Sequence, residues 1–167
     1  MTLEKPQYVE NVTCAELTRK DILKLLQSKI LKQMISLCSR KNGIGLAAIQ
    51  VGIRKKFFVA FRPDTKVKGQ VNMGNWCVFI NAEYKFKGKE IYQVEEGCLT
   101  YGKDTYLVTR HKKIIASWDE IDSSDNVKRV KQELDGLFAQ VFQHECDHLN
   151  NITINRIGKK VGGNNGT

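Results

Sequence analysis

Apolar positions recur at helical spacing in an early stretch of the chain, from about Asp21 to Arg40. They are Ile22, Leu23, Leu26, Ile30, Leu31, Met34, Ile35 and Cys38. Thr18 or Asp21 can cap the start of this helix, and Asn42-Gly43 is a natural end. The pattern therefore predicts one N-terminal amphipathic helix.

The same spacing returns near the end of the chain. Its apolar positions are Leu137, Phe138, Val141, Phe142, Cys146 and Leu149. Asp135-Gly136 precedes this stretch and Asn150-Asn151 follows it, and both pairs suit helix boundaries. We therefore expect a second amphipathic helix between them.

Between the helices the apolar runs become short and are separated by turn residues, which is typical of strands. The runs are KFFVAF (56–61), WCVFIN (76–81), AEYKFKG (82–88), EIYQVEEG (90–97), YLVTR (106–110), KKIIASW (112–118) and NVKRVKQ (126–132). A short strand is also expected in ITINRI (152–157). This order predicts an α+β fold, with antiparallel and mixed sheets around the second helix. We expect one domain over residues 1–157 and a flexible tail over 158–167.

Composition narrows the class of protein. The chain has 167 residues, of which 41% are hydrophobic and 27% charged, as in a globular protein. Its five cysteines are irregularly spaced, and no segment resembles a secretion signal or a membrane span. We therefore expect a reduced cytoplasmic protein that does not enter a membrane.

The net charge of +9 permits a polyanionic partner such as RNA. However, the basic residues are spread along the chain, and no RNA-binding signature accompanies them. We therefore expect a generic basic surface, no specific nucleic-acid partner, and a monomer.

The segment QHECDHLNN contains two of the three histidines of the chain. Residues four apart on a helix differ by only ~40° around its axis, so His144 and His148 can reach one metal ion. Glu145, rotated by ~100° from His144, can act as a general base beside that ion. A surface helix with two solvated histidines is the alternative. It is weakened because Val141 and Leu137 extend the same face into apolar territory.

A catalytic divalent site usually has three protein ligands and one water. No histidine or carboxylate follows His148, so the third ligand must lie upstream. Cys98 is favoured, because it lies where a strand runs into a glycine and can present a side chain together with free N–H groups. His111 remains possible, although its two lysine neighbours suggest a solvated turn.

Three segments, taken together, resemble the peptide deformylase family. GIGLAAIQ (43–50) is similar to the family motif G-x-G-L-A-A-x-Q, EGCLT (96–100) to E-G-C-L-[ST], and QHECDHL (143–149) to Q-H-E-x-D-H-L. Asp135-Gly136 and Arg110 also fit the flanking pattern of the family. The resemblance extends over about residues 20–155.

The resemblance implies a metal-dependent hydrolase that removes the N-formyl group from the formylmethionine of newly made polypeptides. Cys98, His144 and His148 would hold one divalent ion. Fe(II) is the ion expected in the cell, whereas Zn, Ni or Co could occupy a purified sample, because this ligand set suits several metals.

The resemblance also implies roles for residues around the ion. Glu145 would be the general acid and base of the reaction. Gln50 and the backbone N–H of Leu99 would bind the formyl oxygen, where preorganised donors stabilise the developing charge.

N-formylmethionyl peptides are the partners that the resemblance implies, and their methionine side chain requires an apolar pocket. The expected lining residues of this pocket are Ile44, Val94, Leu137, Gln140 and Val141, and Gly45, beside the peptide backbone, and Gly97 are also expected to bind the substrate. Gln140 departs from the family, which usually has an apolar residue one turn before His144, and could narrow the pocket or shift its preference. We nevertheless expect formylmethionyl peptides to remain the best substrates. Tyr101-Gly102 also departs from the family pattern, in a loop that borders the outer substrate positions.

Two alternatives have specific evidence against them. An HExxH metallopeptidase would draw its third ligand from further along the chain, where none is found. An inactive deformylase-like binder of peptides or RNA would not need Gln50, Cys98 and Glu145 together.

The C-terminus suggests a trimmed member of the family. Residues 149–167 follow the last histidine and are rich in Gly and Asn, which are poor helix formers. Many bacterial relatives have a longer C-terminal helix that contacts the ribosome, so we expect a phage-type or trimmed relative with only transient ribosome proximity. The expected location is the cytoplasm, or the host cytoplasm if a phage encodes the protein.

Overall fold

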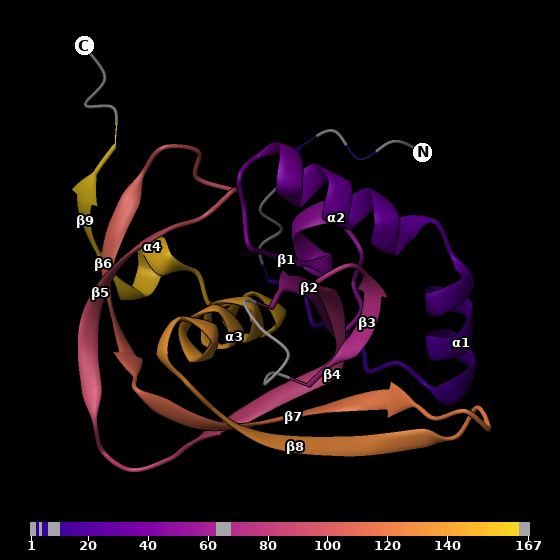
Figure 1. Cartoon of the computed structure of the whole chain (residues 1–167). Helices are drawn as coiled ribbons and strands as arrows, with labels where there is room; N and C mark the ends of the chain where they lie inside the picture. The colour runs from indigo at the N-terminus through magenta and orange to yellow at the C-terminus, as the bar shows by residue number, and fades with distance from the viewer. Residues whose placement is uncertain (1–2, 4, 7–10, 63–67, 164–167) are drawn as a thin grey trace.

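The computed structural model of the chain describes residues 3, 5–6, 11–62 and 68–163. Helix α3, Gly136–Leu149, lies in the middle of the molecule with strands on opposite sides of it (Figure 1). It is the second helix that the apolar spacing predicts, and it ends at the expected cap residue, Asn150.

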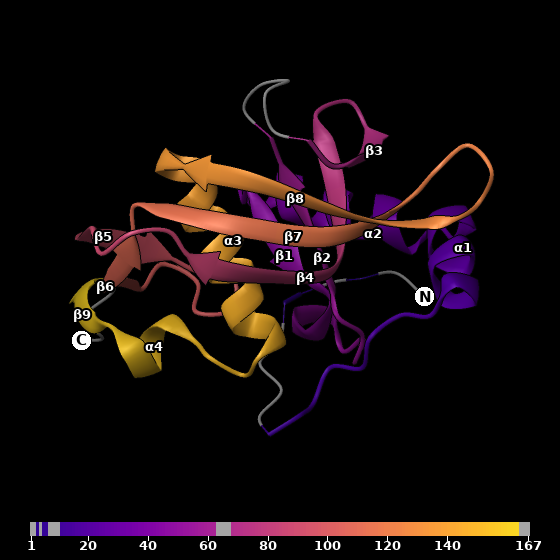
Figure 2. The ribbon, with the colours of Figure 1, turned by 90° about the horizontal axis from the view of Figure 1, so that it is seen from below.

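Two sheets frame this helix. The strands of the larger sheet are β1 (Gly45–Ala47), β2 (Phe57–Phe61), β3 (Gln70–Met73), β4 (Trp76–Phe86), β7 (Lys113–Ile121) and β8 (Val127–Asp135). They follow the order β1-β2-β4-β7-β8, and β3 also pairs with β4. The strands of the smaller sheet are β5 (Ile91–Gly97), β6 (Thr105–His111) and β9 (Lys159–Gly162), in the order β5-β6-β9. Figure 2 shows the long strands β4, β7 and β8 side by side.

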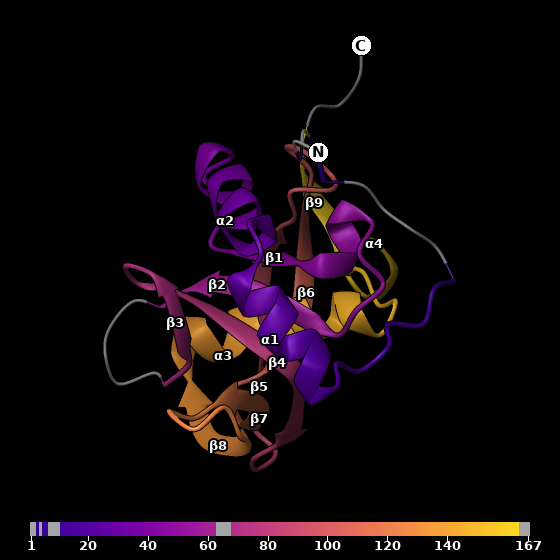
Figure 3. The ribbon, with the colours of Figure 1, turned by 90° about the vertical axis from the view of Figure 1, so that its right-hand side faces the viewer.

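The larger sheet is covered on both faces at β2 and the first half of β4, which explains why these segments are apolar at nearly every position. Phe58 and Phe79 face α3, where their rings pack against Phe142 at centroid distances of 5.1 and 5.4 Å. The neighbouring residues Phe57 and Val59 belong to a second core cluster, which the N-terminal helices cover (Figure 3). The sheet therefore holds α3 at a fixed depth inside the molecule.

Two helices, α1 (Arg19–Gln27) and α2 (Ile30–Arg40), form where one was expected. The break lies at Ser28, whose hydroxyl donates to the Leu25 carbonyl at 2.7 Å and accepts from the Ile30 N–H at 3.3 Å. Serine competes with the helix backbone in this way. The prediction of a continuous helix is therefore wrong, although its apolar stripe faces the core.

The stretch expected to form two strands, divided after Asn81, forms the single strand β4. The pairing of β4 with β7 shifts register between Ile80 and Glu83, and Asn81 has a φ of 50°. The side chain of Asn81 accepts from the Leu17 N–H at 2.8 Å and donates to the Leu17 carbonyl at 2.9 Å. A bulge bends a strand without ending it, which is why the predicted break is absent.

A single helical turn, α4 (Ile154–Ile157), replaces the short strand expected over residues 152–157. Thr153 precedes this turn, and its hydroxyl donates to the Asn155 side chain at 2.6 Å. The backbone of this segment forms local hydrogen bonds, since the Gly158 N–H donates to the Ile154 carbonyl at 2.9 Å. It therefore forms a helical turn instead of the expected strand.

The flexible tail expected from residue 158 onward is wrong for residues 159–162, which form β9 and pair with β6. The glycines that suggested a loose tail instead allow close packing. A Cβ at Gly158 would lie 2.8 Å from the Ile154 carbonyl oxygen. Residues 164–167 lie outside the described residues.

The strand pairing confirms the predicted α+β class. Each named strand pair in the described part of the chain is antiparallel. Parallel pairing there is limited to an isolated bridge between Ala15 and Lys55, so the expected mixed sheets are not found. None of the helices among the described residues has the length and apolar character needed to cross a bilayer.

Candidate active site

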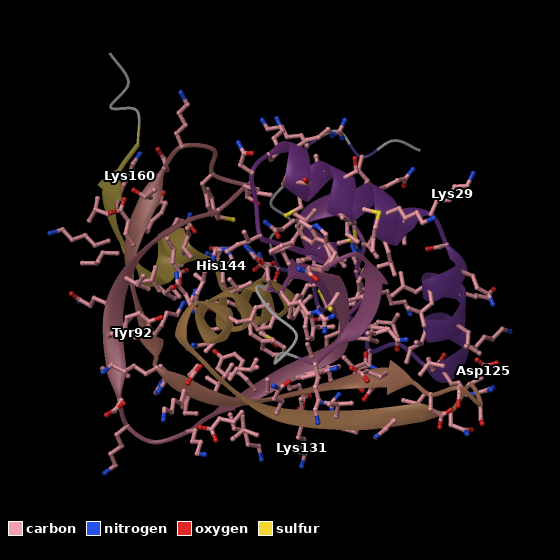
Figure 4. All side chains as sticks on the ribbon, in the orientation of Figure 1. Lys29, Tyr92, Asp125, Lys131, His144 and Lys160 are labelled. Carbon is pink, nitrogen blue, oxygen red and sulfur yellow. The ribbon has the colours of Figure 1, made fainter. Side chains whose placement is uncertain are left out.

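Helix α3 has two faces with different surroundings. Phe138, Phe142 and Cys146 belong to the core cluster shared with the larger sheet. His144 and His148 therefore lie on the opposite side, toward the smaller sheet, and Figure 4 places His144 beside α3 in the interior. The orientation expected from helical spacing is the one found.

Gln143 fixes the position of this helix. Its side-chain oxygen accepts from the backbone N–H of His111 at 3.0 Å, and its amide donates to the His111 carbonyl at 2.9 Å. The same amide donates to the Ala139 carbonyl at 3.1 Å. Gln143 is almost fully buried, so these bonds hold α3 against the end of β6, a role that the sequence pattern did not reveal.

Three donor atoms converge beside α3. Cys98 Sγ lies 3.3 Å from His148 Nε2, which lies 3.2 Å from His144 Nε2. One ligand atom from each of the three residues falls within 4.8 Å of the others. Donors of one tetrahedral ion, each ~2.0–2.3 Å from it, lie roughly 3.3–3.6 Å apart, so this cluster fits a single ion. His111, the other candidate, is not in the cluster.

A buried carboxylate orients the first histidine. His144 Nδ1 donates to Glu96 Oε2 at 2.9 Å, which leaves Nε2 free as a ligand. Arg110 donates to both carboxylate oxygens of Glu96 at 2.8 Å. Burial favours the neutral acid, but the bonds from Arg110 and His144 lower the pKa of Glu96 to about 2. Glu96 therefore stays ionised and holds the imidazole in one tautomer.

We predict that Glu96→Gln weakens metal binding by about 10–100-fold, because the amide cannot hold His144 as a carboxylate does. Competition with a chelator measures the change. The matched control is Glu95→Gln, since the Glu95 side chain accepts from Thr105 at 2.7 Å instead of from a metal ligand. Equal metal affinity in both variants would contradict the orienting role.

The charge around the donors suits a cation. Burial alone lowers the pKa of His144, but hydrogen bonds with Cys98 and Glu96, together with the nearby Glu145, raise it to about 10. Burial and the adjacent His144 lower the pKa of His148, so this ring stays neutral, whereas a metal ion must displace a proton from His144 to bind there. The site thus stabilises positive charge at the point where the donors meet.

Glu145 lies beside these donors and is 4% exposed. Burial raises the pKa of its carboxyl to about 7. Its Oε2 has no hydrogen-bond partner among the described residues. A buried carboxylate with a free oxygen and a pKa near neutrality can take up and release a proton at the site.

Gln50 connects two of the motif segments. Its side-chain oxygen accepts from the Ala47 N–H at 2.8 Å, which fixes the orientation of the amide. The Nε2 group then points to Thr100 Oγ1 at 3.0 Å and to Cys98 Sγ at 3.5 Å. An N–H donor is thereby held in place beside the metal donors.

A pocket of about 370 Å³ opens onto Cys98, His144 and Glu145. Six of the residues expected to bind the substrate line this pocket, namely Ile44, Gly45, Gly97, Leu137, Gln140 and Val141. Gln50 and Leu99 also line it. Val94 does not line it, because it lies two residues before Glu96 on β5, ~7 Å earlier along the strand.

Arg110 and Asp147 complete the site, and neither was assigned a role from the sequence. Arg110 is 3% exposed and donates to Asp147 as well as to Glu96. Asp147 in turn accepts from the Tyr84 hydroxyl at 3.5 Å. The sequence marked these two residues only by their presence in or near the family motifs. Their contacts join segments that are distant in the chain, so the sequence pattern did not reveal their roles.

Comparison with known proteins found one family in both sequence and fold. The family described as Polypeptide deformylase matches residues 9–161. Peptide deformylase from Thermotoga maritima is 35% identical over 127 residues, which are 75% of this chain and 68% of that protein. The crystal structure of a Thermotoga maritima peptide deformylase has a TM-score of 0.74 at 28% identity, covering 94% of this chain and 97% of that one. A probable peptide deformylase from Synechococcus phage S-SSM7 gives a TM-score of 0.70 at 27% identity and covers 92% and 98%.

Proposed function

Because the chain belongs to the polypeptide deformylase family, we propose that Cys98, His144 and His148 hold the divalent ion on which its activity depends. The protein removes the formyl group from newly made peptides, and the products are formate and a free N-terminus. The convergence of the three donor atoms next to Glu145 is the observation that carries the residue assignment.

The donor set decides which metals are suitable. When bound, a divalent ion supplies an activated water and polarises the formyl carbonyl. One thiolate and two imidazoles suit Fe(II), Zn, Ni and Co. We propose Fe(II) as the ion used in the cell, with the others as substitutes in a purified sample.

Glu145 is the group that transfers the proton from water to the departing amine. Its free Oε2 takes the proton of the attacking water and later gives it to the departing amine. A pKa near 7 suits both steps, because the carboxyl is then neither too weak a base nor too weak an acid.

Gln50 and Leu99 stabilise the oxygen of the formyl group. Gln50 Nε2 is already oriented by the Ala47 bond, so little reorganisation is needed when negative charge develops. The backbone N–H of Leu99, next to the Cys98 ligand, supplies the second donor.

The peptide is proposed to bind as an added strand. β1 lies at one edge of the larger sheet, and β5 lies at one edge of the smaller sheet. Gly45 of β1 and Gly97 of β5 both line the pocket. An extended peptide between these edges can use their backbone groups, with the first side chain directed into the pocket.

Gly45 makes room for the proposed base. A Cβ at this position would lie 2.8 Å from Glu145 Cδ and closer still to Oε1. We predict that Gly45→Ala displaces the carboxylate and lowers kcat/KM for formyl-Met-Ala-Ser by about 10²-fold. Steady-state assays of formate release measure the loss.

A double variant tests the cause of that loss. If Gly45→Ala acts by displacing Glu145, adding it to Glu145→Gln should cost little more than Glu145→Gln alone. Fully additive losses would show that the alanine acts elsewhere.

The cellular setting follows from the substrate. Formylated peptides arise at the ribosome, so we propose a cytoplasmic enzyme, or one in the host cytoplasm if a phage encodes it. We further propose that it acts as a monomer near the ribosome, with transient contact and without a specific nucleic-acid partner.

Product analysis tests the reaction itself. Incubation with formyl-Met-Ala-Ser should release formate and leave Met-Ala-Ser. An HExxH metallopeptidase would instead release formyl-Met. An inactive binder would leave the peptide unchanged under conditions in which it still binds.

A further inference from the structure

The far wall of the substrate pocket separates it from a second pocket. Leu137 and Gln140 of α3 line both cavities, which have volumes of about 370 and 670 Å³. The second pocket is also lined by Tyr92 of β5 and by Lys112 and Lys113. One apolar residue, Leu137, and one polar residue, Gln140, therefore lie between the two cavities.

The amide of Gln140 contacts the Tyr92 hydroxyl. The Tyr92 hydroxyl donates to Gln140 Oε1 at 3.5 Å, and Figure 4 shows Tyr92 on the strand that passes α3. The two N–H groups of the same amide have no protein partner among the described residues. Both Gln140 and Tyr92 are half-buried, and Gln140 lines the substrate pocket, so these donors can face a bound side chain.

Three aliphatic side chains line the same pocket as Gln140. They are Ile44, Leu137 and Val141. An aliphatic wall favours the methionine thioether, which is only a weak hydrogen-bond acceptor. A single amide donor in such a wall adds affinity for a side chain of similar shape that ends in a stronger acceptor.

Methionine sulfoxide is such a side chain. Oxidation of methionine adds one polar oxygen to an otherwise similar chain. In a fully aliphatic pocket that oxygen would be buried without a partner, which is costly. We propose that the Gln140 amide donates to this oxygen, so that the protein also deformylates peptides whose first residue is formylmethionine sulfoxide. This inference rests on the proposed function.

Formyl-Met peptides remain the best substrates, because the Gln140 donor lowers only the penalty for oxidation. Gln140 offsets part of the cost of burying the sulfoxide oxygen, and the thioether has no such cost. Formylnorleucine has a similar shape without sulfur, so its turnover should not depend on the amide donor.

The test compares kcat/KM for three peptides, formyl-Met-Ala-Ser, its sulfoxide and the norleucine analogue, in the metal-loaded enzyme. In Gln140→Leu, the ratio of sulfoxide to formyl-Met turnover should fall by about 2-fold to 10-fold, the range for one neutral hydrogen bond. The ratio of norleucine to formyl-Met should stay the same. Tyr92→Phe should lower the sulfoxide ratio part of the way, because the amide loses its contact with the hydroxyl.

Gln93→Leu is the matched control, since Gln93 is exposed on the opposite face of β5 and lines neither pocket. It should leave all ratios at the wild-type value. An unchanged or increased sulfoxide ratio in Gln140→Leu, with formyl-Met still turned over, would overturn this inference alone. Failure of the wild type to turn over any of the three peptides would overturn the proposed function and this inference with it.

Discussion

Replacing Glu145 by glutamine is expected to lower kcat/KM for formyl-Met-Ala-Ser by about 10²–10⁴-fold while the bound metal is retained. The glutamine keeps the shape of the side chain beside Gly45 but cannot accept the proton of water. The wild-type carboxyl is suited to that task, because burial raises its pKa to about 7 and Oε2 has no protein partner among the described residues. Formate release and metal content, measured on the same sample, give the two quantities.

The metal content separates two explanations of a loss. A variant that keeps one ion per chain and loses activity has lost the base. A variant that loses both the bound ion and the activity would show that Glu145 supports the ion instead. Full activity in Glu145→Gln would refute the proposed role.

Replacing Cys98 by alanine is expected to remove most of the bound metal. Loss of an inner ligand leaves only the two imidazoles of His144 and His148, so the effect should exceed the about 10–100-fold weakening seen for outer-shell changes. Elemental analysis after anaerobic purification, followed by chelator competition, measures it. Formate release should fall in parallel.

Cys146→Ala is the matched control for this experiment. Cys146 lies on the same helix between the two histidines, but it is 1% exposed and packs in the core cluster on the other face. Removing its thiol should lower the free energy of unfolding and leave the metal content at one ion per chain. If Cys98→Ala retained its metal while Cys146→Ala lost it, the ligand assignment would be wrong.

Helical spacing was sufficient to predict how His144 and His148 lie. Four residues on a helix return to nearly the same direction, so the two rings had to be neighbours. The apolar residues of the same helix also showed which face is buried. These features depend on local geometry, which a sequence pattern reports directly.

The contacts of Glu96 and Arg110 could not be predicted in the same way. Glu96 lies on β5 and Arg110 on β6, so their contact depends on the register between these two strands. In that register Tyr92 lies directly opposite Arg110. A strand pattern shows which residues alternate but does not fix which partner each one meets. The sequence therefore showed a motif at Glu96 and gave no role for its carboxylate.

The boundaries of helices and strands were also harder to predict than their presence. Ser28 interrupts a helix whose apolar stripe continues on both sides, and Asn81 bends a strand that does not end. Gly158 looked like part of a loose tail, although close packing against Ile154 requires it. Asn81 is held by a tertiary contact with Leu17, whereas at Ser28 local side-chain hydrogen bonds compete with the helix backbone.

Titration of the metal-free protein with Co(II) tests the central claim most directly, because one experiment follows both the ligands and the activity. We predict a thiolate-to-cobalt absorption band that saturates at one equivalent, with formate release from formyl-Met-Ala-Ser rising in the same proportion. The band should be absent in Cys98→Ala. Formate release by the metal-free protein, or saturation of activity without a thiolate band, would contradict the account.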